Sequence, residues 1–184
     1  VTIQSTGMGG PSAAIVVEEL IGLGAHVLVR TGTCGALDPN HDLGGLVAAT
    51  EVIGADGASR ALGADERLRP DRALTEALVA SGARPVTAVS TDLFYDPRPG
   101  IDDEWRRGGA QVIEMEAAAV LAAAAGRGAR AACLLLVTDV LAPDARARID
   151  QGELEQRELA LGELALAALG ADAAREAEGR KQRQ

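Results

Sequence analysis

The sequence has 184 residues, which is long enough for one domain with a buried core. Its formal net charge of −9 argues against a surface that binds nucleic acid. Hydrophobic residues make up 47% of the chain and aromatic residues only 2%, so we expect a core of Val, Leu, Ile and Ala. No apolar run reaches the ~20 residues that a membrane span needs, and no signal-peptide pattern opens the chain. The two cysteines, Cys34 and Cys133, lie far apart with no CxxC spacing. We therefore expect a reduced, cytoplasmic protein without a disulfide, a metal site, or a nucleic-acid or membrane partner.

Apolar periodicity and turn residues predict strands that alternate with helices along the chain. Strands are expected at residues 1–6, 26–29, 46–53, 86–91, 110–113 and 131–137. Helices are expected at residues 13–23, 71–81, 102–107, 117–125 and 151–169. This pattern predicts an α/β fold, a single domain at residues 1–172 with a central mixed β-sheet flanked by helices, followed by a polar C-terminal tail at residues 173–184. Because residues 1–6 already alternate like a strand without an initiator methionine, we expect the sequence to begin inside a longer protein or to have been trimmed.

Three polar groups interrupt the apolar, alanine-rich sequence: the Arg-Thr-Gly-Thr-Cys-Gly stretch at residues 30–35, Glu-Met-Glu at 114–116, and Thr-Asp at 138–139. Each follows a predicted apolar strand, and in an open α/β sheet ligands bind beyond the carboxyl ends of the strands. A cation with hydroxyl and amide donors suits an anion, a carboxylate pair suits a diol, and an aspartate suits a basic heterocycle. The three groups together predict a nucleoside site.

The candidate anion site combines Arg30 with two glycine-containing stretches. An arginine that closes a buried strand needs an anionic partner, either a phosphate or a local carboxylate such as Asp38 or Glu51. The hydroxyl of Thr33 and the nearby backbone N–H groups favour phosphate. The glycine-rich residues 7–12 precede a predicted helix and would let the backbone approach an anion, although they fit a tight strand-to-helix turn equally well.

The candidate sugar and base sites depend on acidic and aromatic side chains. Glu114 and Glu116 share a face of an extended backbone, where they accept hydrogen bonds from a diol, form the acidic start of the next helix, or do both. Met115 is expected to cover a sugar ring or to fill the core. Asp139 either caps a helix or acts as a buried general acid. The aromatic pair that begins with Phe94 either stacks on a base or packs in the core.

In this order and context the motifs resemble the nucleoside phosphorylase family, which includes purine nucleoside phosphorylases and uridine phosphorylases. The matching stretches are residues 7–12, 30–35, 90–95, 112–118 and 137–139. Cys34 and the stretch at 90–95 are closest to the hexameric purine branch. Uridine phosphorylases carry a glutamine and an arginine for the pyrimidine near residues 96–103, where this sequence has Arg98 but no glutamine. The resemblance implies phosphorolysis of a purine nucleoside by inorganic phosphate to a free base and (deoxy)ribose 1-phosphate, without a metal or organic cofactor, in a dimer-based homo-oligomer such as a trimer or hexamer.

The resemblance also implies a role for each matching residue. The phosphate-binding residues are Gly9, Arg30 and Thr33. The ribose-binding residues are Thr33, Met115 and Glu116. The base-binding residues are Cys34, Gly35, Phe94, Ile113 and Asp139. Arg30 and Asp139 are the expected catalytic residues, because the first holds the nucleophilic phosphate and the second protonates the purine.

The sequence departs from the family pattern at three places. The family arginine that assists the aspartate falls on Gly152, so Arg146 or Arg148 would have to replace it. The family segment before the residue aligned with Val1, which supplies further phosphate-binding groups and residues that reach a neighbouring subunit, is not in this sequence. The C-terminal tail has no counterpart. Three alternatives therefore remain open: a nucleosidase that uses water, a uridine phosphorylase, and a non-catalytic nucleoside-binding homologue.

Overall fold

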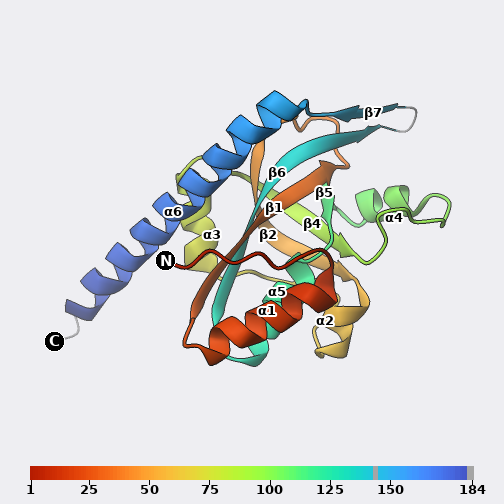
Figure 1. Ribbon diagram of the computed structural model, residues 1–184. Helices are drawn as coiled ribbons and strands as arrows, with labels where there is room; N and C mark the ends of the chain where they lie inside the picture. Colours follow the sequence, from red (N-terminus) through yellow and green to blue (C-terminus); the bar gives the residue numbers. More distant parts are fainter. Residues whose placement is uncertain (143–144, 182–184) are drawn as a thin grey trace.

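A mixed β-sheet with the strand order β3-β2-β4-β5-β1-β6-β7 forms the centre of the protein (Figure 1). The computed structural model describes residues 1–142 and 145–181. The strands of this part are β1 (Val27–Ala36), β2 (Leu46–Ala55), β3 (Arg67–Leu68), β4 (Arg84–Thr91), β5 (Val112–Glu114), β6 (Arg130–Ala142) and β7 (Ala145–Arg148). The helices are α1 (Gly10–Gly22), α2 (Gly57–Ala61), α3 (Arg72–Ala80), α4 (Ile101–Arg107), α5 (Ala117–Gly126) and α6 (Gln151–Lys181). The α/β class and the mixed sheet flanked by helices, both expected from the sequence, are confirmed.

The sheet curls so that β2, near one end of the strand order, also meets β6, near the other end. β1 runs parallel to β6 along its whole length, and β2 runs parallel to β4. Through residues 46–48, β2 also pairs with β6 in the antiparallel direction. The sheet therefore closes partway on itself, as long and strongly twisted strands tend to do.

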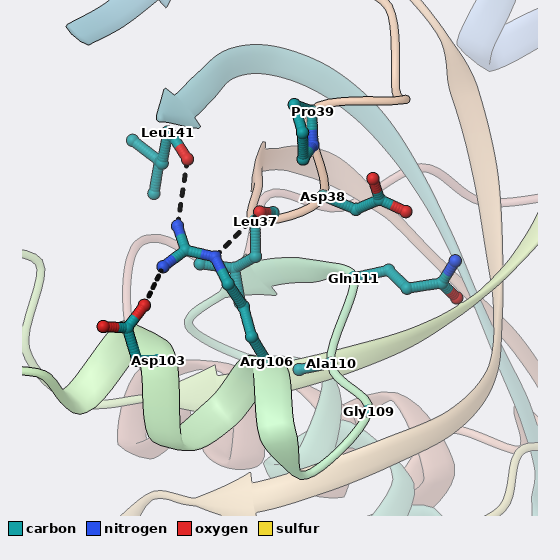
Figure 2. Close-up of a pocket in the computed structure, with 9 residues that line it drawn as sticks. All are labelled: Leu37, Asp38, Pro39, Asp103, Arg106, Gly109, Ala110, Gln111 and Leu141. Atoms are coloured by element: carbon teal, nitrogen blue, oxygen red, sulfur yellow. Dashed lines mark hydrogen bonds and ion pairs between the residues drawn. The ribbon is translucent and has the colours of Figure 1, made fainter. Parts of the chain in front are cut away.

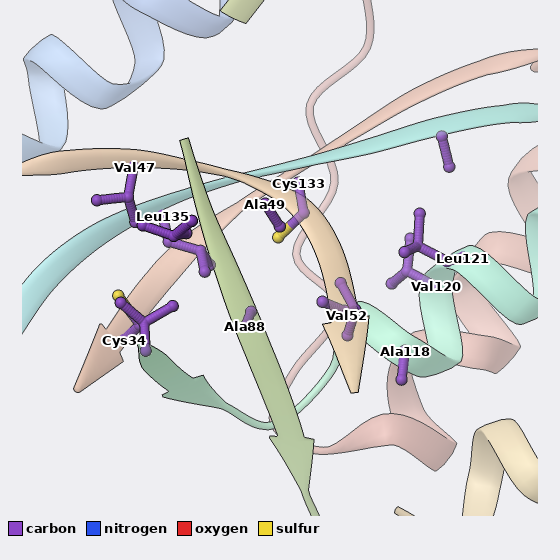
Figure 3. Close-up of a cluster of buried hydrophobic side chains, with 14 of the residues drawn as sticks. Cys34, Val47, Ala49, Val52, Ala88, Ala118, Val120, Leu121, Cys133 and Leu135 are labelled. Carbon is purple, nitrogen blue, oxygen red and sulfur yellow. The ribbon is translucent and has the colours of Figure 1, made fainter. Parts of the chain in front are cut away.

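One face of the sheet is covered by α1 and α5, whose small side chains allow close packing (Figures 1 and 3). Every residue of α5 from Ala117 to Ala124 is buried, against a sheet surface that includes Cys34 of β1 and Cys133 of β6. A Cβ atom at Gly10 would lie only 3.2 Å from the Cβ atom of Ala119, so the start of α1 approaches α5 closely. This approach brings the residues before α1 next to the residues between β5 and α5.

The other face is covered by α3 and α6. Leu74 and Leu78 of α3 and Leu161 of α6 pack in one cluster with Leu134 and Leu136 of β6. The residues of β6 that alternate with these leucines face α1 and α5 instead. β6 is therefore buried on both faces, as its long apolar run predicts.

The expectation of a strand at residues 1–6 is wrong. These residues have no regular secondary structure, and Val1 and Ile3 are 94% and 87% exposed. A strand needs a partner for its backbone N–H and C=O groups, and no strand in the described part of the chain pairs with this segment. The alternation of residue types was therefore not sufficient to form a strand.

The expectation that Arg30 and Asp139 follow the ends of their strands is also wrong. β1 continues to Ala36 and β6 to Ala142, so both residues lie inside strands. The two strands pair in parallel throughout, with a register shift just before Gly35 that places Gly35 opposite Asp139. Because each strand supplies the other's backbone hydrogen bonds, both continue through their polar residues.

Helix α6 is longer than expected, since it continues past Leu169 to Lys181. Arg130, the first residue of β6, donates hydrogen bonds to Asp172 and Glu176 on this helix. These ion pairs fasten the polar half of α6 to the sheet. Among the described helices, none combines the length and the apolar character needed to cross a membrane.

Candidate active site

A cavity of about 1540 Å³ lies beside β1. β5 pairs with β1 only at Gly35 and Ala36. The edge of β1 that faces β5 is therefore without a strand partner at residues 27–34, as far as the described residues show. The cavity is lined by residues 25–35, by residues 1–8, by the end of β5 and by part of α6. The expected site residues in its wall are Arg30, Thr33, Cys34, Gly35, Phe94, Ile113, Met115, Glu116 and Asp139. Residues far apart in the sequence thus meet around one space.

Arg30 places a positive charge in this cavity. Its side chain is 10% exposed, and its Nη2 forms ion pairs with Glu116 and, at 3.0 Å, with Glu114. These carboxylates, not Asp38 or Glu51, are therefore the partners of Arg30. The Nη1 atom is buried and, among the described residues, has no hydrogen-bond partner.

The electrostatics keep Arg30 charged. Burial by itself would lower the pKa of Arg30, but the carboxylates of Glu114 and Glu116 outweigh it, so the pKa is raised. A buried N–H of a charged group is costly when nothing accepts from it. Nη1 is therefore suited to donate to an anion that enters the cavity.

Glu114 and Glu116 make different contacts. Oε2 of Glu114 accepts from the backbone N–H of Glu116 at 2.9 Å and of Ala117 at 2.8 Å, and the hydroxyl of Ser90 donates to its Oε1. Glu114 therefore stabilises the first turn of α5, which is one of the two interpretations open from the sequence. Oε2 of Glu116 accepts a hydrogen bond from Nη2 of Arg30, the same atom that lies 3.0 Å from Oε2 of Glu114.

Gly9 contributes through its backbone. It directly precedes α1, and its φ of +91° lies in the region that favours glycine. Its N–H donates to Oε1 of Glu116 at 2.5 Å. The Glu116 carboxylate is thus held between the start of α1 and the guanidinium of Arg30.

Asp139 lies inside β6, so the alternative that it caps a helix is wrong. Its side chain is 9% exposed, its Oδ2 accepts from the hydroxyl of Thr138 at 3.0 Å, and its Oδ1 accepts from Nε of Arg146 at 2.9 Å. Nε of Arg148 is farther away, at 3.8 Å. The guanidinium of Arg146 also lies 5.2 Å from the ring centroid of Phe94. Arg146 therefore connects the buried carboxylate to the aromatic wall of the cavity.

The remaining wall residues differ in exposure. Cys34 is buried, and burial raises the pKa of its thiol well above the usual value, so the thiol is neutral at pH 7. A Cβ atom at Gly35 would lie 3.3 Å from Cγ2 of Ile113, so these two residues form a tight part of the wall. Phe94 is 54% exposed, and Met115 is partly buried.

Thr33 lies three residues after Arg30 on the same strand. Side chains at such a spacing leave opposite faces of a strand. Thr33 is exposed, and both residues line the same cavity. A single ligand can contact both Arg30 and Thr33 only if it lies at the unpaired edge of β1, where the two faces of the strand meet.

Two contributors had no assigned role in the sequence interpretation. Ser90, at the end of β4, donates to Glu114 and accepts from the backbone N–H of Ala118 at 2.9 Å, which joins β4, β5 and α5. Gly32 lies against the guanidinium of Arg30, whose atoms are the nearest neighbours of a Cβ built at this glycine. The signal for Gly32 was present in the sequence, because residues two apart on a strand share a face.

A second cavity, of about 440 Å³, contains none of the expected site residues (Figure 2). Arg106 of α4 crosses it, and its guanidinium donates to the backbone oxygens of Leu37 and Leu141 and to Asp103. All three arms of the guanidinium are engaged, so Arg106 anchors α4 to the ends of β1 and β6. In the described part of the chain, no three His, Cys, Asp or Glu side chains gather as a metal site requires.

Comparison with known proteins places this geometry in a family. Residues 1–173 match the model of the phosphorylase superfamily, and the chain belongs to this family. It is 40% identical over 145 residues to a guanosine phosphorylase of Halorubrum lacusprofundi, covering 74% of this chain and 59% of the relative. It is 35% identical over 158 residues to a uridine phosphorylase of Thermococcus kodakarensis, covering 74% and 57%. A DeoD-type purine nucleoside phosphorylase of Roseobacter denitrificans is 33% identical over 150 residues, covering 77% and 64%.

These relatives confirm the resemblance to nucleoside phosphorylases. Their printed names include both purine-directed and uridine-directed enzymes, so identity alone leaves the base open. The chain spans less than two thirds of the length of each of the three.

Proposed function

We propose that the protein containing this chain is a purine nucleoside phosphorylase. It would transfer the pentosyl group of a purine nucleoside to inorganic phosphate, which gives a free base and (deoxy)ribose 1-phosphate. The observation that carries this proposal is the buried guanidinium of Arg30, which lies in the same cavity as Glu116 and Asp139 and whose Nη1 has no hydrogen-bond partner among the described residues. The proposal requires phosphate as co-substrate and no metal or organic cofactor.

The proposed reaction assigns one task to each group. Arg30 binds the phosphate and, with the hydroxyl of Thr33, orients one phosphate oxygen toward the anomeric carbon. The bond from this carbon to the base nitrogen breaks as the bond to phosphate forms, and the electron pair remains on the base. Asp139 donates a proton to the base, which makes it a better leaving group. The ribose is held by its hydroxyls on Glu116 and by the apolar face of Met115.

Two features support a purine over uridine. Asp139 is buried in the cavity wall, and Thr138 and Arg146 fix the orientation of its carboxyl group, which we assign to the purine nitrogen. Arg98, the arginine present in the region where uridine phosphorylases bind the pyrimidine, is bound to Asp96 through several hydrogen bonds. The name of the Halorubrum lacusprofundi relative, a guanosine phosphorylase, agrees with this preference.

The nucleosidase alternative replaces phosphate by water. A hydrolase has no need for a buried cation beside its nucleophile, so Arg30 favours phosphate. A non-catalytic nucleoside-binding protein would not need Asp139 as an acid, because binding requires no proton transfer. The proposal also includes a homo-oligomer, as the family resemblance implies, and light scattering at micromolar concentration tests that part separately.

The proposal is tested by measuring base release from inosine, guanosine and uridine with and without phosphate, using the full protein. We expect release from the two purine nucleosides only when phosphate is present. Equal rates in phosphate-free buffer would identify a nucleosidase. Faster cleavage of uridine would identify a uridine phosphorylase, and no release from any nucleoside would favour a binding protein.

A further inference from the structure

The side chain of Arg30 lies along β1 over Gly32. Residues 30 and 32 share a face of the strand, and a Cβ atom built on Gly32 would lie 2.9 Å from Cζ and 3.0 Å from Nη2 of Arg30, and closer still to Nη1. Real Cβ atoms essentially never approach other heavy atoms to under 3.0 Å. The guanidinium therefore occupies the space that any side chain at position 32 would need.

The backbone does not explain a glycine at this position. Gly32 is not among the glycines with positive φ, unlike Gly9, and it pairs with Leu135 in the parallel ladder of β1 and β6. Any residue can adopt this conformation, and glycine inside a strand usually weakens it. The physical reason left for glycine is the space that it leaves for Arg30.

This space decides what Arg30 can reach. Arg30 lies inside β1, yet its Nη2 pairs with Glu114, the last residue of β5, and with Glu116, which follows that strand. In this conformation Nη1 lies nearest to Gly32 while Nη2 reaches both carboxylates. A methyl group at position 32 would force the guanidinium to move from this place, so we expect its contacts with Glu114 and Glu116 to change.

We propose that Gly32 is a positioning residue for phosphate binding, because its missing side chain fixes the guanidinium of Arg30 in the anion-binding orientation. This inference rests on the proposed role of Arg30 as the phosphate ligand. Gly32 itself need not touch the phosphate, and its effect passes through Arg30. The clash falls on the far end of a flexible side chain, so the fold should tolerate the substitution.

The test is a double-mutant cycle in the full protein with Gly32→Ala, Arg30→Lys and the double variant. We expect Gly32→Ala to raise the KM for phosphate roughly 10-fold or more, with a smaller change in the KM for nucleoside. In the Arg30→Lys background the same alanine should change the phosphate KM by less than about twofold, because the lysine ammonium has no planar fork to displace. Gly170→Ala is the matched control and should leave the phosphate KM unchanged, since no atom of the described residues lies within 4 Å of its added Cβ. Thermal unfolding of each variant checks that the fold is intact.

Calorimetric titration with inorganic phosphate provides a readout that does not depend on turnover. A wild-type phosphate affinity that Gly32→Ala does not weaken overturns the inference, and so does a full effect of the alanine in the Arg30→Lys background. An absence of phosphate binding in the wild type also overturns it. If the wild type releases base without phosphate but binds phosphate more tightly than Gly32→Ala does, the proposed function fails and the positioning role of Gly32 stands.

Discussion

Nε of Arg146 donates to Oδ1 of Asp139 at 2.9 Å, while the same guanidinium lies 5.2 Å from the ring centroid of Phe94. β7 carries Arg146 back along β6, so this arginine faces the carboxylate that the proposed reaction uses as an acid. By the family resemblance, the assisting arginine would fall on Gly152, at the start of α6. We infer that Arg146 takes its place in orienting Asp139.

Arg146→Met should therefore reduce kcat for inosine. A hydrogen bond to a charged group contributes about 1.5 kcal/mol or more, which corresponds to a loss of roughly 10-fold. Arg148→Met is the matched control, because its Nε is 3.8 Å from Asp139 and its side chain is 74% exposed. Steady-state kinetics should show a near-normal kcat for this control, and equal losses in both variants would contradict a specific role for Arg146.

Asp139→Asn should slow cleavage of natural purine nucleosides while sparing substrates that need no proton. The amide keeps the size of the side chain but cannot deliver a proton, so the loss should fall on kcat, by ~100- to 10,000-fold. A 7-methylated purine nucleoside, which already carries positive charge on the imidazole ring, should be cleaved almost equally by both forms. An equal loss on both substrates would mean that Asp139 has a structural role.

Arg30→Lys should weaken phosphate binding without removing the charge that Glu114 and Glu116 need. One ammonium cannot replace the fork of a guanidinium, so the KM for phosphate should rise roughly 10- to 100-fold. Arg67→Lys, at a surface pair with Glu51, should change neither KM. The pattern would be contradicted if Arg30→Lys raised the KM for nucleoside and left that for phosphate unchanged.

The ion pairs of Arg130 should make stability depend on pH. Its hydrogen bond to Asp71 lowers the pKa of that carboxyl group, outweighing the effect of burial. A folded-state pKa below the unfolded value means that Asp71 contributes stability above about pH 4, which is lost as the pH falls through its folded-state pKa. Arg130→Met should therefore destabilise the protein by about 2 kcal/mol at pH 7 and by less at pH 3. Urea unfolding at the two pH values measures the change in the free energy of unfolding. The control variant is Arg72→Met, which removes the exposed ion pair of Arg72 with Glu76. A difference that did not shrink at low pH would contradict the account.

Local signals in the sequence predicted much of the fold. Pro11 and the glycines around α1 mark its limits, and the alanine run of α5 forms the buried helix that it predicts. Residues 1–6 show where such signals fail, because a strand also requires a partner that no local pattern reveals. The short elements β3, α2 and β7 were missed because none is long enough to show a clear periodicity. β3 pairs with β2, β7 forms a hairpin with β6, and the side chain of Asp56 caps α2.

The candidate site was predicted in composition but not in geometry. Arg30 and Asp139 were recognised as polar groups in apolar surroundings, yet their place inside β1 and β6 depends on the long pairing of these strands. The choice between Arg146 and Arg148 depends on how β7 pairs with β6. The division of tasks between Glu114 and Glu116 depends on how close α1 comes to α5, which brings the Gly9 N–H to only one of them.

The most direct test of the central claim is the identity of the sugar product. Inosine is incubated with the full protein in phosphate buffer, and the reaction is followed by ³¹P NMR together with an assay for hypoxanthine. The account predicts that inorganic phosphate is consumed and ribose 1-phosphate appears in amounts equal to the hypoxanthine released. Release of hypoxanthine with free ribose and no consumption of phosphate would contradict it.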